Sequence, residues 1–104
     1  MKIAVVQMNS VADKAANIAE ATALIEKAVD EEGPDWVCLP EHWNWAGGAT
    51  AEKVAAADDA PGGPAYAAAQ ELAAKHRIWL HAGSILERAP GEAKVRNTTV
   101  VFDR

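Results

Sequence analysis

Residues 36–48 read WVCLPEHWNWAGG, and this stretch determines how the rest of the sequence is interpreted. A short run of mostly apolar residues, 35–39, ends in a proline and then a glutamate, Glu41. Its nearly continuous apolar character is typical of a strand that is buried on both faces in a parallel sheet. Pro40 has no N–H, so hydrogen bonding to a neighbouring strand ends there. The stretch therefore predicts a buried strand that presents the carboxylate of Glu41 at the edge of a sheet.

The residues before this strand predict another strand and a long helix. Residues 2–8 are few and rich in β-branched side chains, as in a buried strand. Across 13–31, apolar side chains recur every three or four residues, which is the period of an amphipathic helix. Asp13 is typical of a helix start, and the pair Gly33 and Pro34 is typical of a helix end.

The residues after Gly48 predict a short helical turn, a loop, a helix and two further strands. Pro64 suits the first turn of the helix, and Gly83 marks a bend or a close approach of backbones within a strand. The short connection between the last two strands favours antiparallel pairing. The order β-α-β-(α)-α-β-β indicates an α/β layered protein. The expected ranges are 51–57 for the helical turn, 58–64 for the loop DDAPGGP, 64–76 for the helix, and 78–87 and 95–103 for the strands.

The bulk properties exclude several classes of protein. The 104 residues suffice for one small domain, and 50% hydrophobic with 24% charged residues is a globular composition. The net charge of −5 argues against nucleic-acid binding, which needs a basic surface. No apolar run has the length of a membrane span, and the start, MKIAVVQM, lacks the length and cleavage site of a signal peptide. The single cysteine, Cys38, excludes an internal disulfide and fits a reducing compartment, so we expect a cytoplasmic protein.

Four segments, taken in order, resemble the N-terminal part of the nitrilase superfamily, the carbon–nitrogen hydrolases. They read KIAVVQMNS, NIAEATALIEKAVDEEGPDWVCLPE, PGGPAYAAAQELAAKHRIWLHAGSILE and NTTVVFD, and the resemblance extends over essentially the whole chain. The strand end Leu-Pro-Glu is the most specific of these features, and the GSI and NTTVVFD elements that follow it in order support the same family. The resemblance implies the N-terminal portion of an αββα sandwich.

The resemblance also implies a chemistry. Members of the family hydrolyse non-peptide carbon–nitrogen bonds, in amides or nitriles, through a Glu-Lys-Cys triad and a covalent cysteine intermediate, and no cofactor is expected. Glu41 matches the general base, which takes the thiol proton and so generates the nucleophilic thiolate. The lysine stabilises the charge that develops on the substrate. Amide hydrolysis is the expected reaction because it is the broader activity in the family, and the sequence names no particular substrate.

In family members the lysine and the cysteine of the triad follow the last of these strands, beyond the position of residue 104. We therefore expect residues 1–104 to be an N-terminal fragment of a carbon–nitrogen hydrolase domain that is inactive by itself. Half a sandwich would leave a sheet face and open edges uncovered, so we also expect a homo-oligomer. The alternative is a non-catalytic α/β domain that self-associates or binds a partner.

The surroundings of Glu41 suggest how a substrate would be held. In an extended strand, Glu41 would share a face with Val37 and Leu39. Indole rings near it would lower the polarity around the carboxylate, as suits a base that works near neutral pH. Trp43 and Trp45 are candidates for lining the substrate pocket, and packing of the loop against the scaffold is an equally good interpretation of both.

Other residues with catalytic or metal-binding potential receive structural interpretations. Cys38 should point to the face opposite Glu41, inside an apolar run, where a thiol is usually inert. Asn97 and Thr98 match the family's NT element, and their expected role is side-chain hydrogen bonding near the site. The histidines show no shared face and no ligand spacing, so no metal site is expected. They are His42, His76 and His81.

Overall fold

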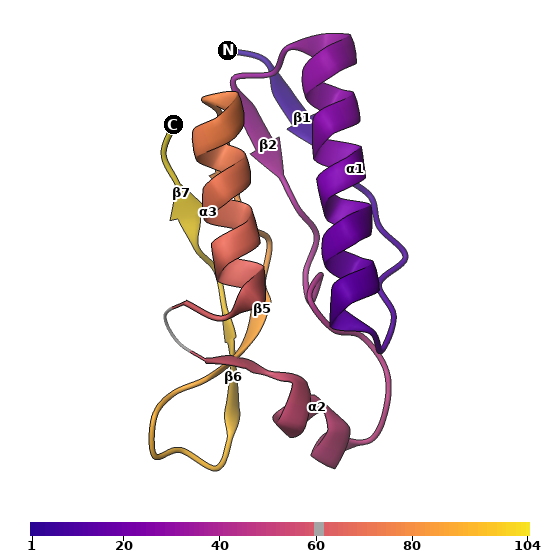
Figure 1. The fold of residues 1–104 in the computed structure, drawn as a ribbon, viewed down its shortest axis with the longest axis vertical. Helices are drawn as coiled ribbons and strands as arrows, with labels where there is room; N and C mark the ends of the chain where they lie inside the picture. Colours follow the sequence, from indigo (N-terminus) through magenta and orange to yellow (C-terminus); the bar gives the residue numbers. More distant parts are fainter. Residues whose placement is uncertain (60–61) are drawn as a thin grey trace.

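The structure, a computed structural model, describes residues 1–59 and 62–104 and has the predicted α/β organisation (Figure 1). The elements in chain order are β1 (Ile3–Val5), α1 (Lys14–Glu32), β2 (Trp36–Cys38), α2 (Thr50–Ala56), β3 (Asp58–Asp59), α3 (Pro64–His76), β4 (Trp79–His81), β5 (Ile85–Arg88), β6 (Val95–Thr98) and β7 (Val101–Phe102). Helices α1 and α3 run side by side over a four-stranded sheet. A smaller sheet with the strand order β3-β5-β6 lies with helix α2 at the lower end of the molecule in Figure 1, next to the starts of α1 and α3.

The larger sheet has the strand order β1-β2-β4-β7. β2 pairs in parallel with both β1 and β4, and β7 pairs antiparallel with β4. Val37 of β2 and its register partner Leu80 of β4 are both 0% exposed. They belong to one core with Ile25 of α1 and with Ala69 and Leu72 of α3. Burial of these side chains holds the two helices on one face of the sheet.

Both long helices begin where the sequence predicts. The Asp13 carboxylate accepts a hydrogen bond from the Ala16 N–H at 3.0 Å, which satisfies one of the free donors at the start of α1. Gly33 follows the end of α1 in the left-handed conformation, with φ 56°, and its N–H donates to the Val29 carbonyl. Helix α3 has Pro64 in its first turn, as predicted. Among the described residues, no helix is long and apolar enough to cross a membrane.

A salt bridge joins α1 and α3 on their exposed side. Lys75 Nζ lies 2.6 Å from Glu26 Oε1, and His76 Nε2 lies 3.8 Å from the same oxygen. The hydrogen bond and charge of Lys75 hold the pKa of Glu26 below its usual value, and the same hydrogen bond raises the pKa of Lys75. Because solvent screens an exposed pair, this contact adds only modestly to the packing of the helices.

The face of the larger sheet that points away from the helices is open in the described part of the chain. Strand residues alternate between faces, so the neighbours of the core residues point outward. Ile3 and Val5 of β1 are 55% and 80% exposed, and Val101 of β7 is 44% exposed. Trp36 and Trp79 stack here, with ring centroids 5.7 Å apart. An apolar surface of this kind is a candidate for association, which itself stays a prediction.

Two predicted strands prove to be divided between the two sheets. The sequence predicts one strand over 78–87 with a bend or a close approach at Gly83. The chain does bend there, and the bend divides the segment into β4 and β5, which join different sheets. Gly83 has a φ of 48°, far from that of an extended strand. The predicted strand over 95–103 is divided in the same way, because β6 pairs with β5 and β7 pairs with β4. The predicted antiparallel pairing of the two segments is confirmed in both halves.

The segment 58–64, predicted as a loop, begins with a strand. Residues Asp58–Asp59 form β3, which pairs in parallel with β5, while residues 60–61 lie outside the described residues. Aspartate is rare in strands, so residue preference alone gives no sign of β3. The pairing is possible here because the carboxylate of Asp58 is buried with charged and polar partners, which are described below.

Candidate active site

A sharp turn after β2 sets the position of Glu41. The Leu39 N–H donates to the His81 carbonyl at 2.9 Å, and Pro40 follows with no N–H to continue the pairing. His42 then adopts a left-handed φ of 50°, and its N–H donates to Ser84 Oγ at 2.8 Å. Glu41 therefore lies just beyond the carboxyl end of β2, within a turn that is fastened to the start of β5.

A side chain from a distant strand contacts the carboxylate. Asn97 Nδ2 of β6 donates a hydrogen bond to Glu41 Oε1 at 2.9 Å, although the two residues are 56 positions apart in the sequence. The expected role of Asn97, hydrogen bonding near the site, matches this contact. Both residues border a cavity of about 260 Å³. The other residues that line this cavity are Leu39, His81, Gly83, Ser84 and Thr99.

Two backbones pack closely where the Glu41 turn meets the junction of β4 and β5. A Cβ added at Gly83 would lie 1.9 Å from the Pro40 carbonyl oxygen and 2.6 Å from that of Leu39. The Ser84 N–H donates to the same Pro40 carbonyl at 3.2 Å. Only glycine permits this spacing, so the close approach predicted at Gly83 is confirmed. The contact acts on the residue that immediately precedes Glu41.

Asn44 fixes the far end of the turn. Its side chain is 0% exposed and pairs with the backbone of Leu86 in β5: Oδ1 accepts from the Leu86 N–H at 3.0 Å, and Nδ2 donates to the Leu86 carbonyl at 3.2 Å. Asn17 of α1, also 0% exposed, donates from Nδ2 to the Asn44 carbonyl at 3.0 Å. Because buried polar groups are costly without partners, these contacts hold the turn firmly to β5 and to α1.

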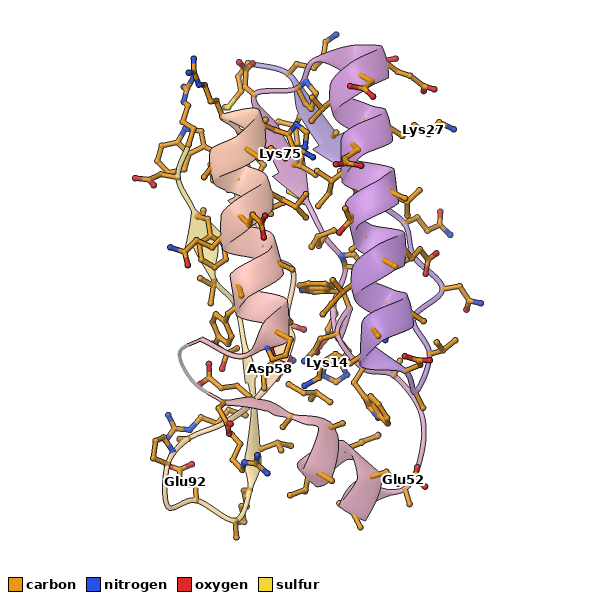
Figure 2. The ribbon with its side chains drawn as sticks, in the orientation of Figure 1. Lys14, Lys27, Glu52, Asp58, Lys75 and Glu92 are labelled. Atoms are coloured by element: carbon orange, nitrogen blue, oxygen red, sulfur yellow. The ribbon has the colours of Figure 1, made fainter. Side chains whose placement is uncertain are left out.

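An ion pair with a buried carboxylate links several elements of the same region (Figure 2). The Asp58 side chain is 0% exposed, and its Oδ1 lies 2.6 Å from Lys14 Nζ at the start of α1. Its Oδ2 accepts from the Ala65 N–H at 2.6 Å, which satisfies a free donor at the start of α3. Asn44 Nδ2 reaches Oδ1 at 3.4 Å. One carboxylate thus links the starts of both long helices to the turn that contains Glu41.

Neither tryptophan of this turn borders the cavity. Trp43 is 1% exposed within the core, and its indole N–H donates to the Ala82 carbonyl at 2.9 Å. The expectation that Trp43 lines a substrate pocket is therefore replaced by the packing interpretation, because apolar side chains enclose its ring. Trp45 is half-buried, and its indole N–H donates to the Gly47 carbonyl at 3.2 Å. A role of Trp45 in substrate binding stays a prediction.

The surroundings of Glu41 are not the indole-rich environment that was expected. Glu41 is exposed, and its partner is the side-chain amide of Asn97 rather than an aromatic ring. His42 has a left-handed conformation, and the indole ring of Trp43, the next residue, is buried in the core. β2 ends at Cys38, so the alternation of an extended strand does not continue to Glu41.

Cys38 and the histidines are distributed as follows. Cys38 is half-buried outside the cavity wall, and its Sγ accepts the Trp36 indole N–H at 3.2 Å. His81 does border the cavity, with Nδ1 accepting from the Gly83 N–H at 3.2 Å. Within residues 1–59 and 62–104, no three His, Cys, Asp or Glu side chains are grouped so as to hold a metal ion.

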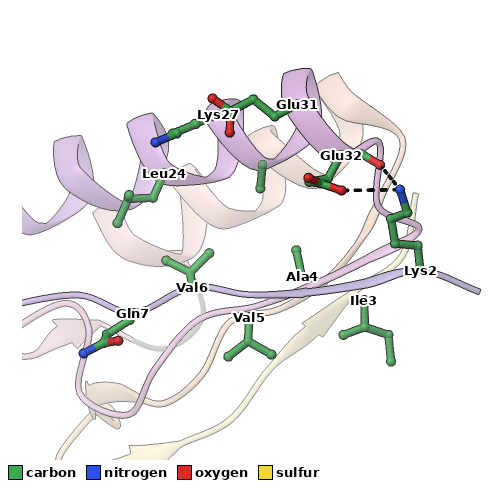
Figure 3. A pocket seen from close by; sticks show the side chains of 11 residues that line it. Lys2, Ile3, Ala4, Val5, Val6, Gln7, Leu24, Lys27, Glu31 and Glu32 are labelled. Carbon is green, nitrogen blue, oxygen red and sulfur yellow. Dashed lines mark hydrogen bonds and ion pairs between the residues drawn. The ribbon is translucent and has the colours of Figure 1, made fainter.

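A larger groove of about 500 Å³ lies elsewhere, between β1 and α1 (Figure 3). Leu24 and Lys27 of α1 line it, and Lys2 Nζ closes one end by donating to the Glu32 carbonyl at 2.7 Å. None of the residues around Glu41 borders this groove. Convergent polar groups mark the smaller cavity as the candidate site, although it is not the largest one.

Sequence analysis identified Glu41 and Asn97 but not the polar residues that hold the turn in place. Lys14, Asn44 and Asp58 each find their partners far along the chain. One weak signal was present, because Asp58 precedes the Pro-Gly-Gly-Pro start of a helix, where a carboxylate commonly satisfies free N–H groups. A second weak signal was Asn44, a polar residue between two tryptophans in the sequence.

Comparison with known proteins places this geometry in a family. A family model for carbon–nitrogen hydrolases matches residues 2–104. Nit3 of Saccharomyces cerevisiae, a member of branch 10 of the nitrilase superfamily, is 30% identical with a TM-score of 0.89, over 99% of this chain and 40% of that one. The NitFhit protein of C. elegans is 31% identical with a TM-score of 0.80, over 97% of this chain and 24% of that one.

A third similar structure comes from a bacterium. XC1258 from Xanthomonas campestris, a CN-hydrolase superfamily protein with an arsenic adduct in its active site, is 25% identical with a TM-score of 0.75. The match covers 100% of this chain and 40% of that one, so the chain spans about two-fifths of the length of XC1258, as it does of Nit3. Because the family match extends over nearly every residue, the chain belongs to the carbon–nitrogen hydrolases of the nitrilase superfamily.

Proposed function

We propose that this chain supplies the general base of an enzyme that hydrolyses non-peptide carbon–nitrogen bonds in small amides. The observation that carries the proposal is the placement of Glu41, which lies beyond the carboxyl end of a parallel strand and borders a cavity with Asn97 at 2.9 Å. Ligands of open α/β sheets bind at the carboxyl ends of the strands. Membership of the carbon–nitrogen hydrolase family supports the same kind of activity.

In the proposed reaction, the Glu41 carboxylate accepts the proton of a cysteine thiol, and the thiolate attacks the carbon of the amide. A lysine stabilises the negative charge that develops on the amide oxygen. The carbon–nitrogen bond breaks, the amine leaves with the proton from Glu41, and a thioester to the cysteine remains. Water then gives a proton to Glu41, and the resulting hydroxide attacks the thioester. The carboxylic acid is released, and Glu41 returns the proton to the departing thiolate, which restores the thiol and the carboxylate.

The lysine and the cysteine are proposed to come from further polypeptide. Residues 1–104 together with that polypeptide are called the complete enzyme below. The chain spans 40% of Nit3, which supports this division. Cys38 lies outside the cavity wall and is therefore not expected to act as the nucleophile. The isolated chain should release no ammonia from amides, and Cys38→Ala should leave that result unchanged. Amides are favoured over nitriles because amide hydrolysis is the broader activity, and the cytosol is the proposed location because the chain has a single cysteine.

Replacement of Glu41 tests the proposal in the complete enzyme. Glu41→Gln keeps the size of the side chain but cannot accept the thiol proton, so turnover of amide substrates should fall by at least about 10⁴-fold. Glu71→Gln, at an exposed position of α3, is the matched control and should retain full turnover. Acyl-enzyme formation is followed by mass spectrometry. If Glu41→Gln acylates and turns over within a factor of a few of the unmodified enzyme, the carboxylate is not the base.

A further inference from the structure

We propose that Asn97 is a positioning residue that determines which oxygen of Glu41 acts as the base. The inference rests on the proposed function and extends it to the residue that orients the carboxylate. Its starting point is the 2.9 Å hydrogen bond from Asn97 Nδ2 to Glu41 Oε1. Both side chains are exposed, so neither is forced into this contact by burial in the core.

The hydrogen bond makes the two oxygens of Glu41 unequal. The amide N–H of Asn97 donates to Oε1, and a carboxylic acid accepts such a bond better through its carbonyl oxygen than through its hydroxyl oxygen. When Glu41 takes up a proton, the proton therefore resides on Oε2 while Oε1 keeps the bond to Asn97. The S–H bond of the cysteine breaks, the O–H bond forms at Oε2, and the electron pair stays on sulfur as the thiolate. Asn97 neither gains nor loses a proton in this step.

The backbone of Leu86 fixes the position of Asn97 relative to Glu41, because the strand of Asn97 pairs with β5 at this residue and the turn of Glu41 is hydrogen-bonded to it. Leu86 of β5 is the register partner of Asn97 in β6. The buried side chain of Asn44 pairs with the N–H and the carbonyl of the same Leu86, at 3.0 and 3.2 Å. The turn that carries Glu41 and the strand that carries Asn97 are thereby fixed to one point. The distance from the amide to the carboxylate is set by the scaffold rather than by the two exposed side chains alone.

Three variants of the complete enzyme test the role of Asn97. Asn97→Ala removes the amide, and Asn97→Asp keeps the shape but replaces the donor by an acceptor that repels the carboxylate. Arg96→Ala is the matched control on the same strand, since Arg96 does not border the cavity and its ion-pair partner is the exposed Glu92. We expect kcat to fall by about 10- to 100-fold in Asn97→Ala and at least as far in Asn97→Asp, because misplacement of a catalytic group has effects of this order. KM should stay within about twofold, and Arg96→Ala should match the unmodified enzyme.

A double-mutant cycle separates positioning from a general structural role. If Asn97 acts through Glu41, Asn97→Ala should lower the acylation rate much less, or not at all, once Glu41→Gln is present. Thermal unfolding of each variant shows whether folding is preserved. The proposal is overturned if Asn97→Ala keeps kcat within twofold, if Arg96→Ala loses as much, or if the loss is undiminished in the Glu41→Gln background. Full turnover in Glu41→Gln alone would instead overturn the proposed function, and this inference with it.

Discussion

Replacing Gly83 by alanine tests whether the close approach of two backbones holds the candidate site in place. The added Cβ would lie 1.9 Å from the Pro40 carbonyl oxygen, whereas ordinary contact begins at 3.4 Å, so the two segments would have to separate by about 1.5 Å. The oxygen belongs to backbone and cannot rotate away as a side chain could. Because Pro40 is joined directly to Glu41, the separation also displaces the Glu41 carboxylate.

The size of the effect follows from what this separation breaks. The Ser84 N–H donates to the Pro40 carbonyl at 3.2 Å, and the Leu39 N–H donates to the His81 carbonyl at 2.9 Å. Loss of each hydrogen bond costs about 0.5–1.5 kcal/mol. The left-handed φ of 48° adds about 1 kcal/mol for any residue with a Cβ. We therefore expect Gly83→Ala to lower the free energy of unfolding by about 2–4 kcal/mol.

Gly91→Ala is the matched control, because Gly91 also has a positive φ, 76°, but nothing lies within 4 Å of an added Cβ. It should lose only the conformational part, about 1 kcal/mol. Urea unfolding of the two variants, followed by circular dichroism at one protein concentration, gives both free energies. Equal losses in the two variants would refute the reasoning, since the left-handed conformation alone would then explain the effect.

Three further measurements test other contacts. Asp58→Ala should lower the free energy of unfolding by about 3–5 kcal/mol, because it removes the partner of the partly buried Lys14 ammonium and the acceptor of the buried Ala65 N–H. Asp59→Ala, at a carboxylate with 78% side-chain exposure, should lose under about 1 kcal/mol, and similar urea curves for the two variants would contradict this. The ion pair of Glu26 stabilises the fold above its ordinary pKa of 4.5 and is lost as the pH falls through the lowered folded pKa, so Glu26→Gln should flatten the acid decline of Tm. An unchanged slope would exclude this contribution. Light scattering should show that the chain self-associates. Val5→Glu, at an 80% exposed residue of the sheet, should reduce the association, and the control Val11→Glu should not. A monomeric wild-type chain at high concentration would argue against this prediction.

The helices were predictable because their signals are local. The apolar period of three to four residues and the cap residue Asp13 placed α1 to within one position at each end, and Pro64 placed the start of α3. The strands around Gly83 were not, because an apolar run does not show which sheet each half joins. That choice depends on pairing with residues far along the chain, β7 for one half and β6 for the other.

The candidate site was predictable only where a motif carried it. The Leu-Pro-Glu strand end identified Glu41, and the NT element identified Asn97 as a residue that bonds near the site. No pattern showed that the two side chains meet, because 56 positions separate them. The position of Trp43 could not be predicted either, because an indole ring suits a pocket and a core equally well. In the structure, His42 has a left-handed conformation, and the Trp43 ring that follows it is buried in the core.

The buried polar residues of this chain have a purpose that apolar packing cannot serve. Apolar burial is non-directional, so it would keep the turn after Glu41 in the interior without fixing its register. The hydrogen bonds from Asn44 to both backbone groups of Leu86 have direction and fit one register only. A general base must come within about 3 Å of the group whose proton it takes, so a shift of one position in this turn would abolish the role that we propose for Glu41. Four of the five buried polar residues in the described part of the chain meet this requirement, because Asn17, Asn44, Asp58 and Ser84 contact the turn or the Asn44 side chain.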